Sequence, residues 1–304
     1  MRTFLAVAAL CVGVSLALAS APQDARASRA AVIVAAGDIA CSPADTTSPC
    51  QDQQTAALLA GADRVLPLGD NQYEAGALSD YLNRYDLSWG RYKSNSSPVP
   101  GNHEYITAGA AGYFDYFDGV GAQTGLAGER NKGYYSYNLA GWHLIALNAN
   151  CGLNGVVGGC TQSSPQMMWL RSDLANSNAT CTLAYWHQPR FSSMTTNKPM
   201  AAAWNLLYAD GADVVLNGHQ HNYERFAPMT PSGALDNAAG IREFIAGTGG
   251  ASLSSFPPTY ATSQVENSTS FGVLKITLYP LKYTWQFVPS GNGTFTDSGT
   301  ARCH

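Results

Sequence analysis

The chain has 304 residues and a formal net charge of −4, and this length suits one large domain. Hydrophobic residues make up 45% of it and charged residues 12%, which excludes a disordered chain, because disorder needs low hydrophobicity and high net charge. No basic block is present, so we expect no nucleic-acid partner held by charge. A small anionic substrate would need local positive charge, which metal ions can supply.

Residues 1–21 have the pattern of a secretory signal peptide. Arg2 precedes an apolar run at residues 4–18, and small residues follow, with cleavage after Ala19 or Ala21. The run is shorter than the roughly 20 residues that span a bilayer. We therefore expect a secreted, extracellular or periplasmic protein with no membrane span after cleavage; an uncleaved N-terminal anchor is the alternative.

The cysteines agree with export. Six remain once Cys11 leaves with the signal peptide, and an even set in an exported chain indicates disulfides. Joining near neighbours predicts the pairs Cys41–Cys50 and Cys151–Cys160, and leaves Cys181–Cys303 to tie down the C-terminal tail. A zinc site is the alternative, but the sequence has no C-x-x-C spacing.

Apolar runs and helical patterns alternate along the chain. Strands are expected at residues 31–36 and 64–68 with a helix at 51–60 between them, a unit typical of parallel sheets. Further strands are expected at 142–147, 182–186 and 214–216, and helices at 165–174 and 199–209. Residues 272–278 and 283–287 look like consecutive strands of an antiparallel edge. This order predicts a mixed α/β fold, one domain over residues 30–304, with two sheets face to face and helices outside.

Polar motifs follow the ends of the apolar runs, and such strand ends are where ligands bind in α/β sheets. A lone Gly-Asp pair is usually an ordinary turn, but five motifs in one chain favour a site. Their carboxylate, phenol, amide and imidazole groups suit borderline or hard metals. The motifs are Gly37-Asp38, Gly69 to Tyr73, Gly101 to Glu104, His187 and Gly218 to His221.

Four of the six histidines lie in these motifs. His143 falls within an expected strand and is interpreted as a packed or hydrogen-bonded core residue, and the C-terminal His304 as exposed. His219 and His221 are two residues apart after a strand, so their side chains can point to the same side.

The five motifs together resemble those of the calcineurin-like metallophosphoesterases, and most closely their purple acid phosphatase branch. Most of that superfamily has Asp-x-His in the first motif, whereas this chain has Asp38, Ile39 and Ala40. The purple acid phosphatase branch instead has a tyrosine three residues after the second aspartate, where this chain has Tyr73. The resemblance covers residues 31–304 and implies a single catalytic domain with an α/β/β/α sandwich.

The resemblance also implies a dinuclear metal centre. The first metal would be held by Asp38, Asp70, Tyr73 and His221, and the second by Asp70, Asn102, His187 and His219. In the family the first metal is usually Fe3+ and the second is Fe2+, Zn2+ or Mn2+. His103 would protonate the leaving group or orient the phosphate, with a supporting hydrogen bond as the alternative role. Glu104 and Arg225 would support ligands, although a salt bridge is the simpler role for Arg225.

The resulting hypothesis is a secreted phosphomonoesterase that uses attack of a metal-bound hydroxide on a small phosphoester, without an obligate protein partner. A phosphodiesterase or nucleotidase on the same metal core is the alternative. A non-catalytic metal-binding surface protein is disfavoured because all seven ligand positions are filled. A serine hydrolase lacks its G-x-S-x-G motif. The aromatic residues after the third motif are expected to pack in the core or to line the substrate entrance: Tyr105, Tyr113, Phe114 and Tyr116.

Overall fold

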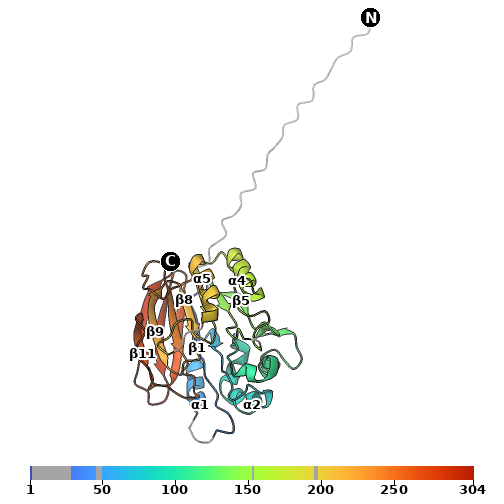
Figure 1. The fold of residues 1–304 in the computed structure, drawn as a ribbon, viewed down its shortest axis with the longest axis vertical. Coiled ribbons are helices and arrows are strands. Elements are labelled where there is room, and N and C mark those ends of the chain that lie inside the picture. The colour runs from blue at the N-terminus through green and yellow to red at the C-terminus, as the bar shows by residue number, and fades with distance from the viewer. Residues whose placement is uncertain (2–28, 46–49, 153, 195–197) are drawn as a thin grey trace.

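Two β-sheets pack face to face in the computed structural model, which describes Met1 and residues 29–45, 50–152, 154–194 and 198–304 (Figure 1). Helices cover the outer face of each sheet, which gives the expected α/β/β/α sandwich. The proposed signal peptide at residues 1–21 lies outside the described residues, Met1 apart. Across the described residues, no helix is long and apolar enough to cross a bilayer.

The five-stranded sheet joins the two ends of the domain. Its order is β14-β13-β12-β1-β2, with β1 at Ala31–Ala36 parallel to β2 at Arg64–Pro67 and antiparallel to β12. The connection between β1 and β2 carries α1 (Asp52–Ala56) and the 3-10 turn η1 (Ala57–Leu59), so the expected single helix is split in two. The remaining strands are β12 (Gly272–Tyr279), β13 (Lys282–Pro289) and β14 (Ser298–Arg302).

The seven-stranded sheet has the order β11-β9-β10-β8-β7-β6-β5. Its centre is parallel and consists of β6 (Trp142–Ala146), β7 (Cys181–Tyr185), β8 (Val214–Asn217) and β10 (Ile241–Ala246). Antiparallel strands flank this centre: β5 (Tyr135–Leu139) on one side, and β9 (Tyr223–Met229) and β11 (Ser263–Asn267) on the other. A separate hairpin pairs β3 (Thr124–Gly125) with β4 (Gly128–Glu129).

Strand side chains alternate between two hydrophobic cores. In β7, Leu183 and Tyr185 face the core between the sheets, whereas Ala184 packs toward the outer helices, as the period of two in a strand requires. Both faces of the strand are therefore apolar, which is typical of a parallel strand covered on both sides.

The outer helices differ between the two faces. Helices α4 (Pro165–Asn176) and α5 (Ala201–Asp210), with the 3-10 turn η6 (Lys198–Met200), cover the seven-stranded sheet. The Ser164 hydroxyl accepts a hydrogen bond from the Met167 amide, and Pro165 occupies the first turn, so α4 begins as its sequence favours. The other face is covered by α1 and shorter pieces: α2 (Leu78–Asn83), η2 (Tyr85–Leu87), η3 (Trp89–Asn95), η4 (Glu104–Ile106), η5 (Ala108–Ala110) and α3 (Ala111–Phe117).

The three expected disulfides are present. The Cα atoms lie 5.9 Å apart in Cys41–Cys50, 5.2 Å in Cys151–Cys160 and 5.4 Å in Cys181–Cys303, separations that a disulfide requires. The pairing leaves no free thiol among these six residues for the alternative zinc site. One expectation needs correction: β12 and β13 are antiparallel to each other but lie inside the sheet, and β14 forms its edge.

Candidate metal centre

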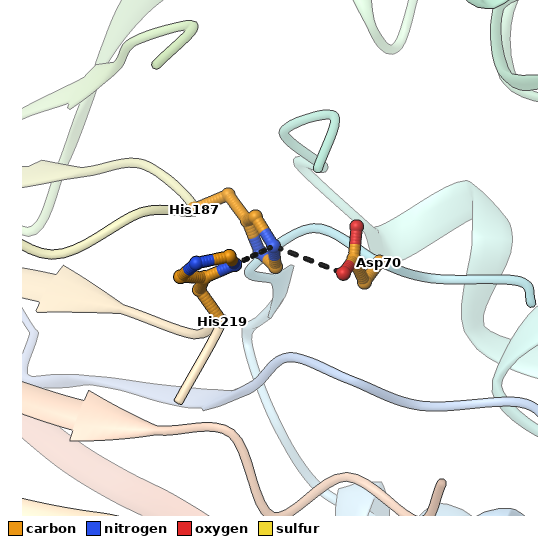
Figure 2. Close-up of side chains that lie close together, drawn as sticks. All are labelled: Asp70, His187 and His219. Carbon is orange, nitrogen blue, oxygen red and sulfur yellow. Dashed lines mark hydrogen bonds and ion pairs between the residues drawn. The ribbon is translucent and has the colours of Figure 1, made fainter. Parts of the chain in front are cut away.

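The five motifs meet where strands of both sheets end. Asp38 follows β1, Asp70 follows β2, His187 follows β7 and His219 follows β8. The carboxyl ends of parallel strands share one edge, and this edge is where α/β sheets bind ligands. Figure 2 shows the Asp70, His187 and His219 side chains converging there from separate connections.

Three of these residues have backbones that non-glycine residues rarely adopt. The φ angles are 60° at Asp38, 46° at Asp70 and 70° at His219, in the left-handed region. The surroundings hold them there: the Asp38 amide donates to the Gly69 carbonyl at 3.0 Å, and the His219 amide donates to Asp38 Oδ2 at 2.8 Å. Backbone strain of this kind concentrates at functional sites.

One group of side chains surrounds Asp38 Oδ1. The Tyr73 hydroxyl donates to this oxygen at 2.9 Å, and His221 Nε2 lies 3.1 Å from it. The Tyr73 hydroxyl is also 3.0 Å from His221 Nε2 and 3.3 Å from Asp70 Oδ2. The Tyr73 hydroxyl thus contacts the other three residues that the resemblance assigns to the first metal.

A second group surrounds His187 Nε2. This nitrogen lies 3.1 Å from Asp70 Oδ2, 3.2 Å from Asn102 Oδ1 and 3.3 Å from His219 Nδ1. The same oxygen of Asp70 therefore contacts both groups. The structure brings together all seven residues expected from the sequence.

Burial and mutual charge shift the titration of these groups strongly. Burial alone would raise the pKa of Asp38, but the neighbouring His221 outweighs it and holds that pKa below its usual value. Burial would lower the pKa of His187, but the carboxylate of Asp70 raises it to about 9. Burial and His187 together lower the pKa of His219 to about 4. The carboxylates and imidazoles of the site are thus strongly coupled to one another in charge.

The donor set fits metal ions by its chemistry. Asp38, Asp70, Tyr73 and His187 are nearly inaccessible to solvent, and buried carboxylates normally need a cation or a metal as partner. His187 Nδ1 donates to the Leu68 carbonyl at 2.8 Å, which leaves Nε2 free to ligate. Two carboxylates, three imidazoles, a phenol and an amide suit borderline metals.

His103 lies at the rim of this cluster. Its ring nitrogen Nδ1 is 2.6 Å from the Glu74 carbonyl, and Nε2 is 3.9 Å from Asp70 Oδ2. The side chain is 23% exposed, so it is both near the cluster and open to solvent. The other two histidines lie elsewhere, as expected: His143 is buried between Asn138 and Asp173, and His304 contacts Asp213.

A cavity of about 790 Å³ opens beside the second group, with Asn102 and His219 in its wall. Of the four aromatic residues expected at the entrance or in the core, only Tyr105 lines this cavity. The other three are buried under the five-stranded sheet: Tyr113, Phe114 and Tyr116. Both expected roles are therefore found: Tyr105 lines the cavity, and the other three aromatic residues pack in the core.

The sequence of the chain matches the calcineurin-like phosphoesterase family over residues 25–223. The chain belongs to this family. Among curated relatives, it is 34% identical to purple acid phosphatase 15 of Arabidopsis thaliana over 160 residues, which cover 48% of this chain and 29% of that protein. It is 23% identical to a nucleotide pyrophosphatase/phosphodiesterase of Hordeum vulgare, over 88% of this chain and 82% of that protein.

Among solved structures, the fold is similar to a purple acid phosphatase from yellow lupin, Lupinus luteus. The TM-score is 0.71 at 21% identity, over 90% of this chain and 54% of that one. This similarity shows the fold. The chain spans less than a third of the length of purple acid phosphatase 15.

Two supporting residues have the positions that the sequence suggested. Glu104 is fully buried and accepts hydrogen bonds from the backbone amides of Asp70, Asn71 and Gly101. Arg225 pairs with Asp297 at 2.7 Å and lies outside the cluster, so the salt-bridge interpretation is confirmed and the ligand-supporting one is wrong.

The sequence did not predict several residues that contact the candidate ligands or their neighbours. Gln188 Nε2 lies 3.5 Å from Asn102 Oδ1 and donates to Asn150 Oδ1 at 3.1 Å. The Ser252 hydroxyl contacts His221 Nδ1 at 2.5 Å. Gln188 directly follows His187, and this adjacency was the one signal available; neither Asn150 nor Ser252 belongs to a motif.

Proposed function

We propose that the protein is a secreted, dinuclear phosphomonoesterase of the purple acid phosphatase type. The observation that carries this proposal is the position of Asp70 Oδ2, 3.3 Å from the Tyr73 hydroxyl and 3.1 Å from His187 Nε2. One carboxylate oxygen shared by two groups of ligand-type atoms is the arrangement expected of a bridging ligand. The family membership and the purple acid phosphatase relatives support the same enzyme class, a metal-dependent phosphoester hydrolase.

Asp38, Asp70, Tyr73 and His221 would hold the first metal, and Asp70, Asn102, His187 and His219 the second. When bound, the ions would lower the pKa of a water molecule to produce a nucleophile and would neutralise charge on the phosphate oxygens. Tyr73 makes Fe3+ the expected first metal, with Fe2+, Zn2+ or Mn2+ as the second.

His103 would act on the leaving group. It is exposed at the rim, and its Nδ1 contact with the Glu74 carbonyl fixes the ring so that Nε2 faces the cluster. A protonated Nε2 in this position could donate a proton to the departing alkoxide or hold a phosphate oxygen. We expect His103→Ala to lower kcat for phenyl phosphate, whose leaving group needs a proton, about 100-fold, with metal content unchanged; unchanged kcat would contradict this role.

The central experiment compares p-nitrophenyl phosphate with its bis-ester on purified mature protein, with metal content and visible spectrum recorded. We expect metal-dependent turnover of the monoester that is lost in Asp70→Ala and in His219→Ala. A visible band that Tyr73→Phe abolishes would support a tyrosinate on Fe3+. Bound metal with no turnover on either ester or on nucleotides would instead favour a non-catalytic metal-binding protein.

A phosphodiesterase or nucleotidase on the same metals is the second candidate. The similarity to the barley nucleotide pyrophosphatase/phosphodiesterase over 88% of this chain favours it. Faster hydrolysis of the bis-ester, or of a dinucleotide, than of the monoester would select this candidate.

Export is proposed from residues 1–21, and the three disulfides are compatible with it. Expression of the full chain, followed by N-terminal sequencing of the protein outside the cytoplasm, tests it. A new N-terminus after Ala19 or Ala21 is expected, and an intact Met1 on a membrane-bound form would indicate the uncleaved anchor.

A further inference from the structure

The cavity beside Asn102 and His219 lies next to the site proposed to bind the phosphate of the substrate. Its lining is mostly apolar, with Tyr105, Ile106, Pro189 and Pro199, and the polar part comes chiefly from amide groups such as those of Asn150 and Gln188. None of the described residues that line it is Asp, Glu, Lys or Arg. The wall therefore offers no fixed charge.

The sequence around the cavity explains this lack of charge. Much of the wall comes from residues 149–152 and from Asn154 and Gly155, and no Asp, Glu, Lys or Arg lies between Lys132 and Arg171. Two cations flank the lining in sequence without joining it. Arg190 lies over the Phe191 ring at 4.4 Å, and Lys198 is exposed and outside the lining.

We propose that this cavity binds the leaving group of the substrate, and that it selects phosphate monoesters of uncharged, partly apolar alcohols, such as aryl phosphates, over polyanionic esters. The assignment rests on the proposed phosphatase function. A second or third phosphate in the cavity would lose hydration and find no cation in the wall, which is costly. An aryl group would instead gain apolar contact.

Tyr105 and Ile106 are the residues that define this selectivity. The Tyr105 hydroxyl accepts a hydrogen bond from Asn148 Nδ2 at 2.7 Å, which fixes the ring in the cavity wall. Ile106 follows it and is 60% exposed, so an apolar side chain of this size is left open to a ligand. Together they present an aromatic and an aliphatic surface to the leaving group.

The test compares kcat/KM for 1-naphthyl phosphate with that for myo-inositol hexakisphosphate and ATP, on protein containing its metals. We expect naphthyl phosphate to be preferred by about 10-fold or more, because a phosphate that loses water without gaining a cation is disfavoured by at least that factor. Ile106→Lys places a cation in the wall and should shift the ratio toward hexakisphosphate. Leu281→Lys is the matched control, because it adds the same charge at a residue of similar exposure, 62%, in the turn between β12 and β13.

A binding measurement gives a second readout. Calorimetry should show that Tyr105→Ala weakens binding of phenylphosphonate about 10-fold and leaves methylphosphonate unchanged, since only the first has a ring for the cavity. Equal or better use of hexakisphosphate by the unmodified protein, or the same ratio in Ile106→Lys and Leu281→Lys, would overturn the leaving-group assignment alone. No turnover of any ester would overturn the proposed phosphatase function itself.

Discussion

Glu104 shows how a residue that would ligate no metal can determine the geometry of the site. Its carboxylate accepts hydrogen bonds from the amides of Asp70, Asn71 and Gly101 and from the Tyr81 hydroxyl, all between 2.6 and 3.0 Å. Burial and the charge of Asp70 raise the pKa of Glu104 to about 6. One side chain thus joins the second motif to the third.

Replacing Glu104 should therefore damage both stability and metal binding. In Glu104→Gln the amide group cannot accept all of these bonds, and an amide hydrogen would face a backbone N–H. We expect a loss of about 2–4 kcal/mol in the free energy of unfolding and 10- to 100-fold weaker metal binding. Urea unfolding and metal titration measure the two effects.

The exposed Glu129→Gln is the control, because the Glu129 side chain lies at the surface, where it pairs with Lys132. A Glu104→Gln protein with the stability and metal affinity of this control would show that the carboxylate does not organise the site.

The seven candidate ligands could be predicted from the sequence because each lies in one of five short motifs, and the resemblance to the metallophosphoesterases assigned each of them a role. Gln188, Asn150 and Ser252 could not, because their contacts join residues far apart in sequence. Asn150, for example, donates to the Pro100 carbonyl at 3.2 Å. Nothing near residue 150 indicates that the third motif folds back against it.

At the level of elements, most interior strands were predicted, but β9 and β10 were missed although they are largely buried. Of the edge strands, β2 was predicted, whereas β5, β11 and β14 were not. β7 is buried throughout and has the sequence CTLAY, whereas β11 and β14 have the sequences SQVEN and SGTAR. Polar residues protect an exposed edge from unwanted pairing, and for the same reason such a strand resembles a loop in sequence. The short helices α2 and α3 lack the length over which helical periodicity becomes visible.

Residue 101, in the third motif, lies so close to Asp70 after β2 that only glycine fits there. A Cβ atom on Gly101 would overlap the backbone nitrogen and the carboxylate of Asp70. Gly101→Ala should therefore displace Asp70, lower the melting temperature by several degrees and reduce bound metal. Thermal unfolding and metal analysis of the purified variant are the measurements.

Gly152→Ala is the matched control, since a Cβ atom there meets no atom of the described residues within 4 Å. If both variants unfold at the same temperature and bind the same amount of metal, the close approach of Gly101 to Asp70 is not essential.

For the whole molecule, the disulfides differ in what they hold together. Cys181–Cys303 joins the start of β7 to the C-terminal tail across 122 residues, whereas Cys151–Cys160 closes a loop with a separation of 9. The entropy lost by the unfolded chain rises with loop length, and implies about 5 kcal/mol of stabilisation for the long loop and about 3 for the short one.

We therefore expect Cys181→Ala/Cys303→Ala to destabilise the fold more than Cys151→Ala/Cys160→Ala. Urea unfolding of both double variants provides the comparison, with the second variant as control for the loss of a disulfide as such. Equal destabilisation of the two double variants would mean that the longer loop gives no additional stabilisation.

The same tail gives the fold a pH dependence through Asp213. Asp213 Oδ2 accepts a hydrogen bond from the Thr182 amide at 2.9 Å, and Oδ1 accepts one from the His304 amide at 3.0 Å. Burial raises the pKa of Asp213 from 3.8 to about 6, even though these hydrogen bonds and His304 oppose the shift. The pKa of Asp213 is therefore higher in the folded protein than in the unfolded chain. Between these two pKa values, the folded protein keeps a proton on Asp213 that the unfolded chain has released.

The stability contributed by this proton is fully present below pH 3.8 and is lost as the pH rises through about 6. Asp213→Asn keeps the side chain uncharged at every pH. Relative to this variant, the unmodified protein should lose up to about 3 kcal/mol of unfolding free energy between pH 4 and pH 7. Urea unfolding of both proteins at the two pH values measures the difference, and parallel pH profiles would show that Asp213 is ionised with its ordinary pKa in the fold.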